Sequence, residues 1–230
     1  MSVEQADSLH VFDARSFAFV ASYATGARPF PAAATADGRL AFVPGYSDGT
    51  VTVIDLFNSR VLQTVSVGIQ PSGGAVLPDD IEYAVVVRGE NRIAFINAAS
   101  HVEVGQLTDG IGESPFSIVV APNGRLAFVN NTGSHDISVI DLAERRVIRR
   151  IPVPDIPIVM AVHPSGTELW VSSEGVHRLS VIAIPEEWRD DPRKVPAASA
   201  PGSGVTEVAV LGMIHSGHRT SELWGLEEVE

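Results

Sequence analysis

The chain has 230 residues, 45% of them hydrophobic and 19% charged, so it is long and apolar enough to bury a core as one domain spanning residues 1–230. Its net charge of −12 disfavours nucleic acid and anionic membranes as partners, because both attract clustered cations. It contains no cysteine, which excludes disulfide and thiolate chemistry. Residues 1–7 have no signal-peptide core, and no apolar run approaches the ~18 residues of a membrane helix. We therefore expect a cytoplasmic protein without a membrane span.

Three sequence features return together about every 42 residues. The first is a strand-like segment that ends at positions 13, 55, 97, 141 and 183. The second is a proline, and the third is an apolar strand; the prolines are Pro29, Pro71, Pro115 and Pro157. A period of roughly 40 to 45 residues built from short strands is typical of the blades of a β-propeller. The repeat therefore predicts an all-β fold.

One repeat shows the four strands expected in each blade. Residues 115–121 are apolar and β-branched, which suits an inner strand packed on both faces, and a Pro-Asn-Gly turn follows. Residues 126–129 form the second expected strand, and residues 136–141 alternate as a half-buried third strand should. Residues 147–151 carry charges suited to an outer edge. The sequence thus predicts blades of four antiparallel strands.

The segments 71–76 (PSGGAV), 122–124 (PNG) and 137–141 (ISVID) resemble the bacterial YVTN-type β-propeller repeat. The resemblance covers roughly residues 8 to 184. It implies a propeller, in a family that includes surface-layer, binding and scaffold proteins, and related propellers include cytosolic lactonases and lyases. It does not choose among these functions, because one fold carries many activities.

The ends of the chain decide how the ring closes. The repeat begins at a third strand, so residues 8–24 supply only the outer half of a blade. Residues 208–214 and 222–224 look like the missing inner half, which predicts five blades in a ring closed by pairing the N- and C-terminal strands. Residues 185–204 are then a loop excursion. Alternatively, residues 205–211 are the outer strand of the fourth blade and the ring stays open. A closed ring predicts a monomer, and an open one a homodimer.

Propellers bind ligands at the mouth of the central channel, where loops between second and third strands meet the blade-to-blade crossovers. The loop candidates are Asp48, Glu90, His135, Asp136, Glu174 and His177. The crossover candidates are Arg28, Gln70, Glu113 and Asp155. His135 and His177 occupy equivalent positions in adjacent blades. With Glu113 or Glu174 they would form a catalytic site, either by binding a divalent metal or by acting as acid and base near neutral pH. Two polar residues in solvated loops are the competing interpretation.

Other polar residues have simpler interpretations. His215 and His218 form a second candidate pair, in a hairpin turn on the opposite face unless that segment is a crossover at the channel mouth. Asp55, Asn97 and Asp141 recur with the repeat and are expected to fix turns through side-chain to backbone hydrogen bonds. Trp188 is expected to pack on the rim of the propeller; a lid or a partner anchor is the alternative.

Three functions remain open at this point. The first is a non-catalytic module that binds a small molecule or a protein over one face and the channel mouth. The second is a cytosolic enzyme, a lactonase, lyase or isomerase of a small metabolite, with a His and carboxylate site at the mouth. The third is an incomplete propeller that completes itself by oligomerising. The sequence favours binding, because it contains no catalytic motif and its recurrent residues are those that shape turns.

Overall fold

The computed structural model describes residues 1–153, 155–174, 178–192 and 210–215. Within them the chain forms five antiparallel sheets in sequence order. The first sheet contains β1 (Ser2–Val3), β2 (Ser8–Phe12) and β3 (Phe19–Ala24), with the 3-10 turn η1 (Glu4–Ala6) after β1. The second contains β4 (Ala33–Ala34), β5 (Leu40–Gly45), β6 (Thr50–Asp55) and β7 (Arg60–Ser66).

The remaining sheets repeat the same four-stranded plan. The third contains β8 (Pro71–Val76), β9 (Glu82–Val87), the 3-10 turn η2 (Arg88–Glu90), β10 (Arg92–Asn97) and β11 (Glu103–Leu107). The fourth contains β12 (Pro115–Val120), β13 (Leu126–Asn131), β14 (Asp136–Asp141) and β15 (Arg146–Pro152). The fifth contains β16 (Pro157–Val162), β17 (Glu168–Ser173), β18 (Arg178–Ala183) and β19 (Val210–His215), with the helix α1 (Glu186–Asp190) before β19.

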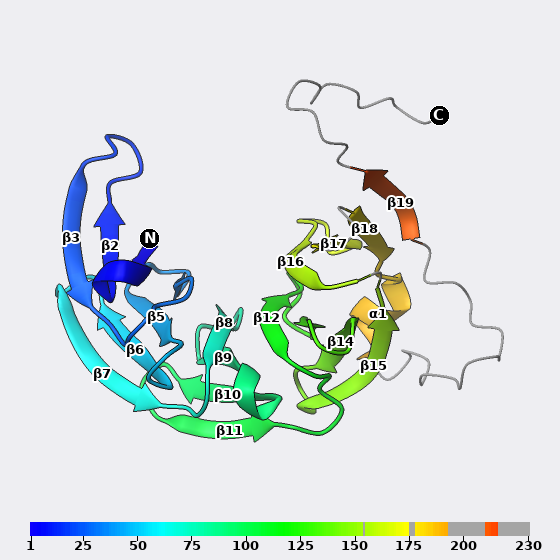
Figure 1. Ribbon diagram of the computed structural model, residues 1–230, viewed down its shortest axis with the longest axis horizontal. Helices are drawn as coiled ribbons and strands as arrows, with labels where there is room; N and C mark the ends of the chain where they lie inside the picture. The colour runs from blue at the N-terminus through cyan, green and yellow to red at the C-terminus, as the bar shows by residue number, and fades with distance from the viewer. Residues whose placement is uncertain (154, 175–177, 193–209, 216–230) are drawn as a thin grey trace.

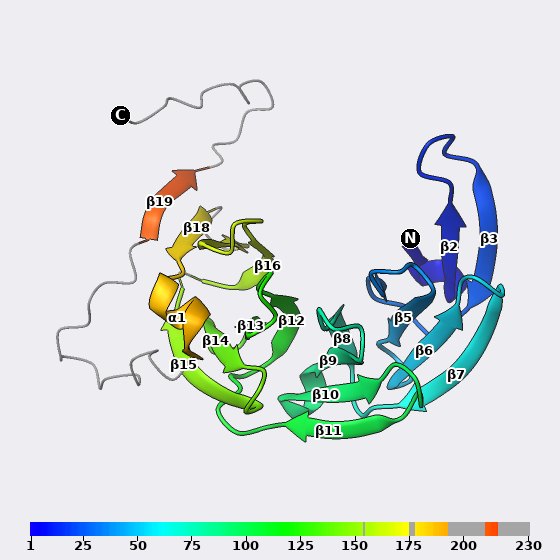
Figure 2. The same ribbon diagram turned by 180° about the vertical axis from the view of Figure 1, so that it is seen from behind.

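The sheets stand side by side around a common centre, as in a β-propeller. Strands β8, β12 and β16 face the centre, and β3, β7, β11 and β15 run along the periphery (Figure 1). The same arrangement seen from behind places the first and fifth sheets at the two ends of an arc (Figure 2). The predicted all-β fold with four-stranded antiparallel blades is confirmed. Among the described residues, no helix is long and apolar enough to cross a membrane.

The C-terminal strand is placed differently from the main prediction. Strand β19 pairs with β18, with Leu179 opposite Ile214 and Ser180 opposite Met213, so it is the outer strand of the fifth sheet. The interpretation of residues 208–214 as an inner strand that closes the ring is therefore wrong. The alternative placed an outer strand at residues 205–211 in the blade that begins at Pro157, which is the fifth sheet; an outer strand is found there, but its described part is Val210–His215. The open hydrogen-bonding edge of β18 accounts for this pairing. The predicted strand 222–224 lies outside the described residues.

The first sheet is shorter than the others. Strand β1 occupies the place of a second strand over two residues only, with Ser2 opposite Leu9 and Val3 opposite Ser8. No described C-terminal residue pairs with this sheet. Within the described residues, the ring is therefore not closed by the N- and C-terminal strands.

The core consists of apolar faces packed between successive sheets. Phe42 of the second sheet stacks on Tyr83 of the third, with ring centroids 4.7 Å apart and planes inclined by 11°. The residues at the repeat position of Phe42 in the third and fourth sheets, Ala84 and Phe128, are also buried. Trp170 holds the same position in the fifth sheet and is 42% exposed, because no described sheet covers that face.

The opposite end of the arc is uncovered in the same way. Phe12 lies on the face of β2 that points away from the second sheet and is 43% exposed. The equivalent residues of the other sheets are almost completely buried: Ile54, Ile96, Ile140 and Ile182. Phe12 instead meets Phe19 and His10 in a small aromatic cluster, with ring centroids 5.8 Å and 6.4 Å from its own.

The recurrent polar residues fix turns, as the sequence predicted. The Asp55 carboxylate accepts the Asn58 backbone N–H at 2.9 Å, and Asn97 and Asp141 accept amides two residues further along at 3.0 Å. The side-chain amide of Asn58, followed by its backbone N–H, lowers the pKa of Asp55 by favouring the ionised form. These residues are therefore part of the scaffold.

The start of the predicted loop excursion contains a short helix. In α1, Trp188 is 4% exposed and packs in the apolar core shared by the fourth and fifth sheets. The Arg149 guanidinium lies 5.4 Å from the centroid of the Trp188 ring. Trp188 thus packs on the propeller, as expected, and does not form a lid. Residues 193–204 of the excursion lie outside the described residues.

Candidate ligand-binding site at the channel mouth

The loops between second and third strands hold the crossovers in place. In three successive sheets, a loop side chain accepts the backbone N–H of a crossover residue 21 positions earlier. The pairs are Asp48 with Ala27, Glu90 with Ile69 and Ser134 with Glu113, at 3.0, 2.9 and 3.0 Å. Two predicted ligand-binding residues, Asp48 and Glu90, therefore use their carboxylates to position the backbone. The Arg92 guanidinium and the Ile69 N–H both lower the pKa of Glu90 by stabilising its charge.

A second hydrogen bond ties each of two crossovers to the preceding sheet. The Arg28 N–H donates to the Asp7 carboxylate at 2.8 Å, and the Ser114 N–H donates to the Asn91 side-chain oxygen at 2.9 Å. The crossover residues adopt left-handed backbone conformations, and the φ values are 55° at Arg28, 57° at Gln70, 49° at Ser114 and 54° at Asp155. Three of the predicted ligand-binding residues, Arg28, Gln70 and Asp155, thus shape the crossovers.

The predicted catalytic residues are only partly described. His135 is exposed and has a φ of 54°, at the turn position that Gly49 and Asn91 occupy in other sheets. Its carbonyl accepts the Val153 N–H at 3.0 Å, while its imidazole makes no hydrogen bond to any described residue. Glu113 and Glu174 are also exposed. His177 lies outside the described residues, so its convergence with His135 stays a prediction.

The second histidine pair and the metal site stay predictions. His215 ends β19, but its side chain lies outside the described part, as does all of His218. Asp136 is buried and pairs with Arg150, which fixes it within the fourth sheet. Among the described residues, no three His, Asp or Glu side chains gather closely enough to hold a metal ion.

One position of every four-stranded blade makes the same backbone hydrogen bond to a crossover. It directly follows each second strand, and its N–H donates to a crossover carbonyl at 2.9 to 3.1 Å. The residues at this position are Tyr46, Arg88, Thr132 and Glu174. Because the backbone is held in the same way in each sheet, these chemically different side chains project from equivalent places on one face.

Two of these side chains form a continuous row with Arg28, with Phe30, which precedes β4, and with Phe116 of β12. The Arg28 guanidinium lies 4.9 Å from the centroid of Tyr46, which stacks on Phe30 at 5.0 Å with an angle of 16°. Phe30 meets Phe116 edge to face at 5.7 Å, and the Arg88 guanidinium lies 5.6 Å from the centroid of Phe116. We call these five residues the arginine–aromatic row. Cations over ring faces are attracted by the ring quadrupole.

Small residues in β8 allow the row to cross the third sheet. Phe30, Ser72 and Phe116 each follow the repeated proline, but serine leaves room for the two phenyl rings to meet. Ser72 is fully buried and its hydroxyl donates to the Phe116 carbonyl at 2.7 Å. A Cβ atom on Gly73 would lie 2.7 Å from the Ser117 Cβ, so the adjacent glycine permits this close approach of β8 and β12.

The two arginines of the row differ in their electrostatic environment. Arg28 is paired with Glu4, with Nε 2.6 Å from the carboxylate. Arg88 is half-buried, and no described carboxylate lies within ion-pair distance of it. Its guanidinium has one long contact with the Thr132 hydroxyl, at 3.4 Å. A half-buried cation without a counter-ion is a place where an anion is stabilised.

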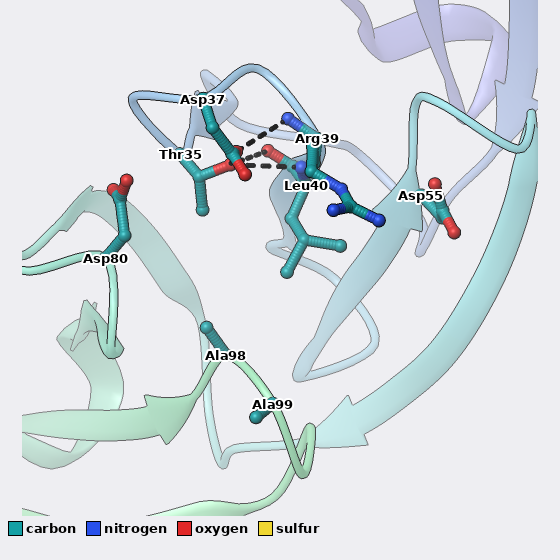
Figure 3. A pocket seen from close by; sticks show the side chains of 8 residues that line it. All are labelled: Thr35, Asp37, Arg39, Leu40, Asp55, Asp80, Ala98 and Ala99. Atoms are coloured by element: carbon teal, nitrogen blue, oxygen red, sulfur yellow. Dashed lines mark hydrogen bonds between the residues drawn. The ribbon is translucent and has the colours of Figure 1, made fainter.

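A pocket of about 430 Å³ lies near the hairpin turns, at the strand ends opposite the loops of the mouth. It is lined by Thr35, Asp37, Arg39, Leu40, Asp55, Asp80, Ala98 and Ala99, and Figure 3 shows its three carboxylates on separate turns. Asp37 accepts the Arg39 N–H at 2.9 Å, and Asp80 accepts the Ala36 N–H at 3.0 Å. Because these carboxylates are used to hold turns, we assign no ligand to this pocket.

Comparison with solved structures supports the fold alone. The chain is similar to hydrazine synthase of Kuenenia stuttgartiensis (TM-score 0.64, 19% identity, 78% of this chain and 71% of that one). It is also similar to the Swd1 (Cps50) β-propeller domain of Myceliophteria thermophila, with a TM-score of 0.68, 16% identity, and coverage of 79% of this chain and 60% of that one. A third match is a protein of unknown function from Desulfotomaculum acetoxidans, with a TM-score of 0.70, 16% identity, and coverage of 80% of this chain and 61% of that one. The chain thus spans less than two thirds of the latter two.

No protein-family model and no curated protein matches the sequence. The likeness to the solved structures therefore supports a β-propeller, while the specific YVTN-type resemblance stays a prediction.

Of the five residues in the row, only Arg28 was among the candidates predicted from the sequence. Tyr46 and Arg88 share one position of the repeat, and Phe30 and Phe116 share another, each directly after a proline. Comparing the chemistry of residues at equal repeat positions would have singled them out. Their contacts with one another depend on how the sheets are arranged in space.

Proposed function

We propose that this protein is a β-propeller binding module whose ligand site is the arginine–aromatic row at the channel mouth. The observation that carries the proposal is Arg88, a half-buried guanidinium held over Phe116 without a described carboxylate partner. Half-buried aromatic rings beside a few polar groups are the usual lining of small-molecule sites. The expected partner is therefore a small anion that has an apolar part.

The crossovers support this assignment by making the site rigid. The crossover segments that carry the row or flank it donate backbone hydrogen bonds to the side chains of Asp48, Glu90 and Ser134. A preorganised site loses less conformational entropy when a ligand binds. Crossovers held by such hydrogen bonds thus suit recognition.

The enzyme alternative depends on different residues. A lactonase, lyase or isomerase would use His135 with His177 and a nearby carboxylate as acid and base. The described geometry does not favour it, because the exposed imidazole of His135 makes no hydrogen bond to a described residue. Binding at the row is accordingly the function that we propose.

The proposal is tested by titrating the ¹⁵N-labelled protein with a fragment library containing anionic, neutral and cationic members. We expect anionic fragments to shift the amide signals of Arg28, Tyr46, Arg88 and Phe116. The Arg88→Gln variant should lose these shifts while keeping the dispersed spectrum of a folded protein. Anionic fragments that act only elsewhere, or equally on the variant, would refute the site.

A further inference from the structure

We propose that the ligand of this site is a monocarboxylic acid with a flat apolar body, anchored by Arg88. This inference rests on the proposed function and adds the chemical class of the ligand. It follows from the charge at the row, the position and chemistry of the guanidinium and the surfaces beside it.

The charge at the site matches a single negative charge. Of the two arginines in the row, Arg28 is already neutralised by Glu4 at 2.6 Å. Arg88 remains as one uncompensated cation in a protein whose net charge is −12. A phosphate dianion would need further cations or several donors to offset its desolvation. A monoanion is balanced by Arg88 alone.

The geometry of Arg88 favours a carboxylate over a spherical anion. The Arg88 Cζ lies over the Phe116 ring, 5.6 Å from its centroid, and the guanidinium N–H groups are the means of binding a ligand. These planar N–H groups match the two oxygens of a carboxylate in a bidentate pair. Thr132 is a positioning residue: its hydroxyl donates to the Ser114 carbonyl at 2.8 Å, so the oxygen faces Arg88 as an acceptor.

The remaining surface of the row is apolar. Phe30, Tyr46 and Phe116 are all half-buried, so each residue of this apolar row keeps some surface accessible to a ligand. A flat hydrocarbon body attached to the carboxylate would cover these ring edges and exclude water from the ion pair. Aromatic groups meeting edge to face gain energy beyond the area that they bury. An aryl carboxylate such as benzoate is therefore the simplest probe.

The test compares three probes by NMR titration at constant ionic strength: benzoate, benzamide and inorganic phosphate. Benzamide keeps the shape of benzoate without the charge, and phosphate keeps an anionic group without the apolar body. We expect benzoate to bind at least about tenfold more tightly than either, as for a charge-assisted bidentate contact. Benzamide binding as tightly as benzoate would overturn the carboxylate assignment, and phosphate binding more tightly would overturn the monoanion assignment.

The protein variants use a matched control. Arg39 on the hairpin-turn face lies over Phe57 at 5.7 Å, much as Arg88 lies over Phe116 at 5.6 Å. Arg88→Gln should weaken benzoate about tenfold or more, whereas Arg39→Gln should leave it within about twofold. Arg88→Lys should recover only part of the affinity, because lysine keeps the charge and loses the planar fork. Equal effects of the two glutamine variants would overturn the role of Arg88.

The outcomes separate this inference from the proposed function. If benzoate does not shift the amide signals of the row but another library member does, the proposed ligand class is wrong and the proposed binding site is retained. If no library member shifts those amides, both proposals fail. Melting curves show whether each variant is folded, and a loss of binding is interpreted only for variants that are folded.

Discussion

The rings of Phe42 and Tyr83 lie 4.7 Å apart and nearly parallel, each fully buried, and they join the second sheet to the third. The Tyr83 hydroxyl is buried with them and has no hydrogen-bond partner among the described residues. Burial alone raises the pKa of Tyr83 far above its usual value of 10. The ring therefore stabilises the interface while its hydroxyl does not.

Tyr83→Phe should leave the free energy of unfolding unchanged or raise it by up to about 1 kcal/mol, because the stack remains and an unsatisfied polar group is removed. Above about pH 10 an unfolded tyrosine ionises while the buried one stays neutral, so stability falls as pH rises. The variant should show a shallower decline in urea titrations between pH 8 and 11. Substantial destabilisation at pH 8 would mean that the hydroxyl has a partner.

Phe128 and Trp170 occupy the same repeat position in different environments, which yields a paired prediction. Phe128→Ala should lower the free energy of unfolding by about 3 to 5 kcal/mol, as for a large core side chain. Trp170→Ala should cost less than about 1 kcal/mol, because its face is uncovered by described residues. Urea-induced unfolding of the two variants measures both.

If Trp170→Ala lowers the free energy of unfolding as much as Phe128→Ala does, then another part of the protein or a second molecule covers this face of the fifth sheet in solution. Light scattering then separates two explanations. A molar mass near 24.4 kDa would indicate cover from the same chain, and twice that mass would indicate the homodimer expected for an open ring.

The loop-to-crossover hydrogen bonds predict a stability effect at an exposed aspartate. Asp48→Ala should destabilise the protein by about 1 kcal/mol, because the Ala27 N–H loses its acceptor. Asp48→Asn keeps a side-chain oxygen as an acceptor and should therefore lose less stability than Asp48→Ala. Asp109 is exposed and its carboxylate bonds to no described residue, so Asp109→Ala controls for removal of a charge. Thermal unfolding of the three variants should separate Asp48→Ala from the other two.

Glu90 contributes stability that depends on pH. Its pKa is lowered in the folded protein by Arg92 and then by the Ile69 N–H, so this contribution is present above about pH 4.5 and is lost as pH falls further. Glu90→Gln keeps an acceptor for Ile69 but does not titrate. The variant should therefore lose less stability between pH 5 and 3 in acid unfolding. Parallel curves for the two proteins would contradict this origin of the acid sensitivity.

The repeated strands, their antiparallel order and the turns at Asp55, Asn97 and Asp141 were predictable from the sequence. Alternation of side chains and turn chemistry act over a few residues, and the 42-residue period shows which segments are equivalent. The role of Trp188 was also predicted, because a bulky aromatic beside a core strand is buried readily.

Only the tertiary structure decided which strand edge β19 joins and which side chains meet at the mouth. Strand β18 and the first sheet both offer an open edge, and the pattern of residues 208–214 suits either, since it specifies a strand but not its partner. Phe30 and Phe116 lie two sheets apart and touch because Ser72 between them is small. Such contacts depend on the curvature and spacing of whole sheets, which short-range sequence patterns do not encode.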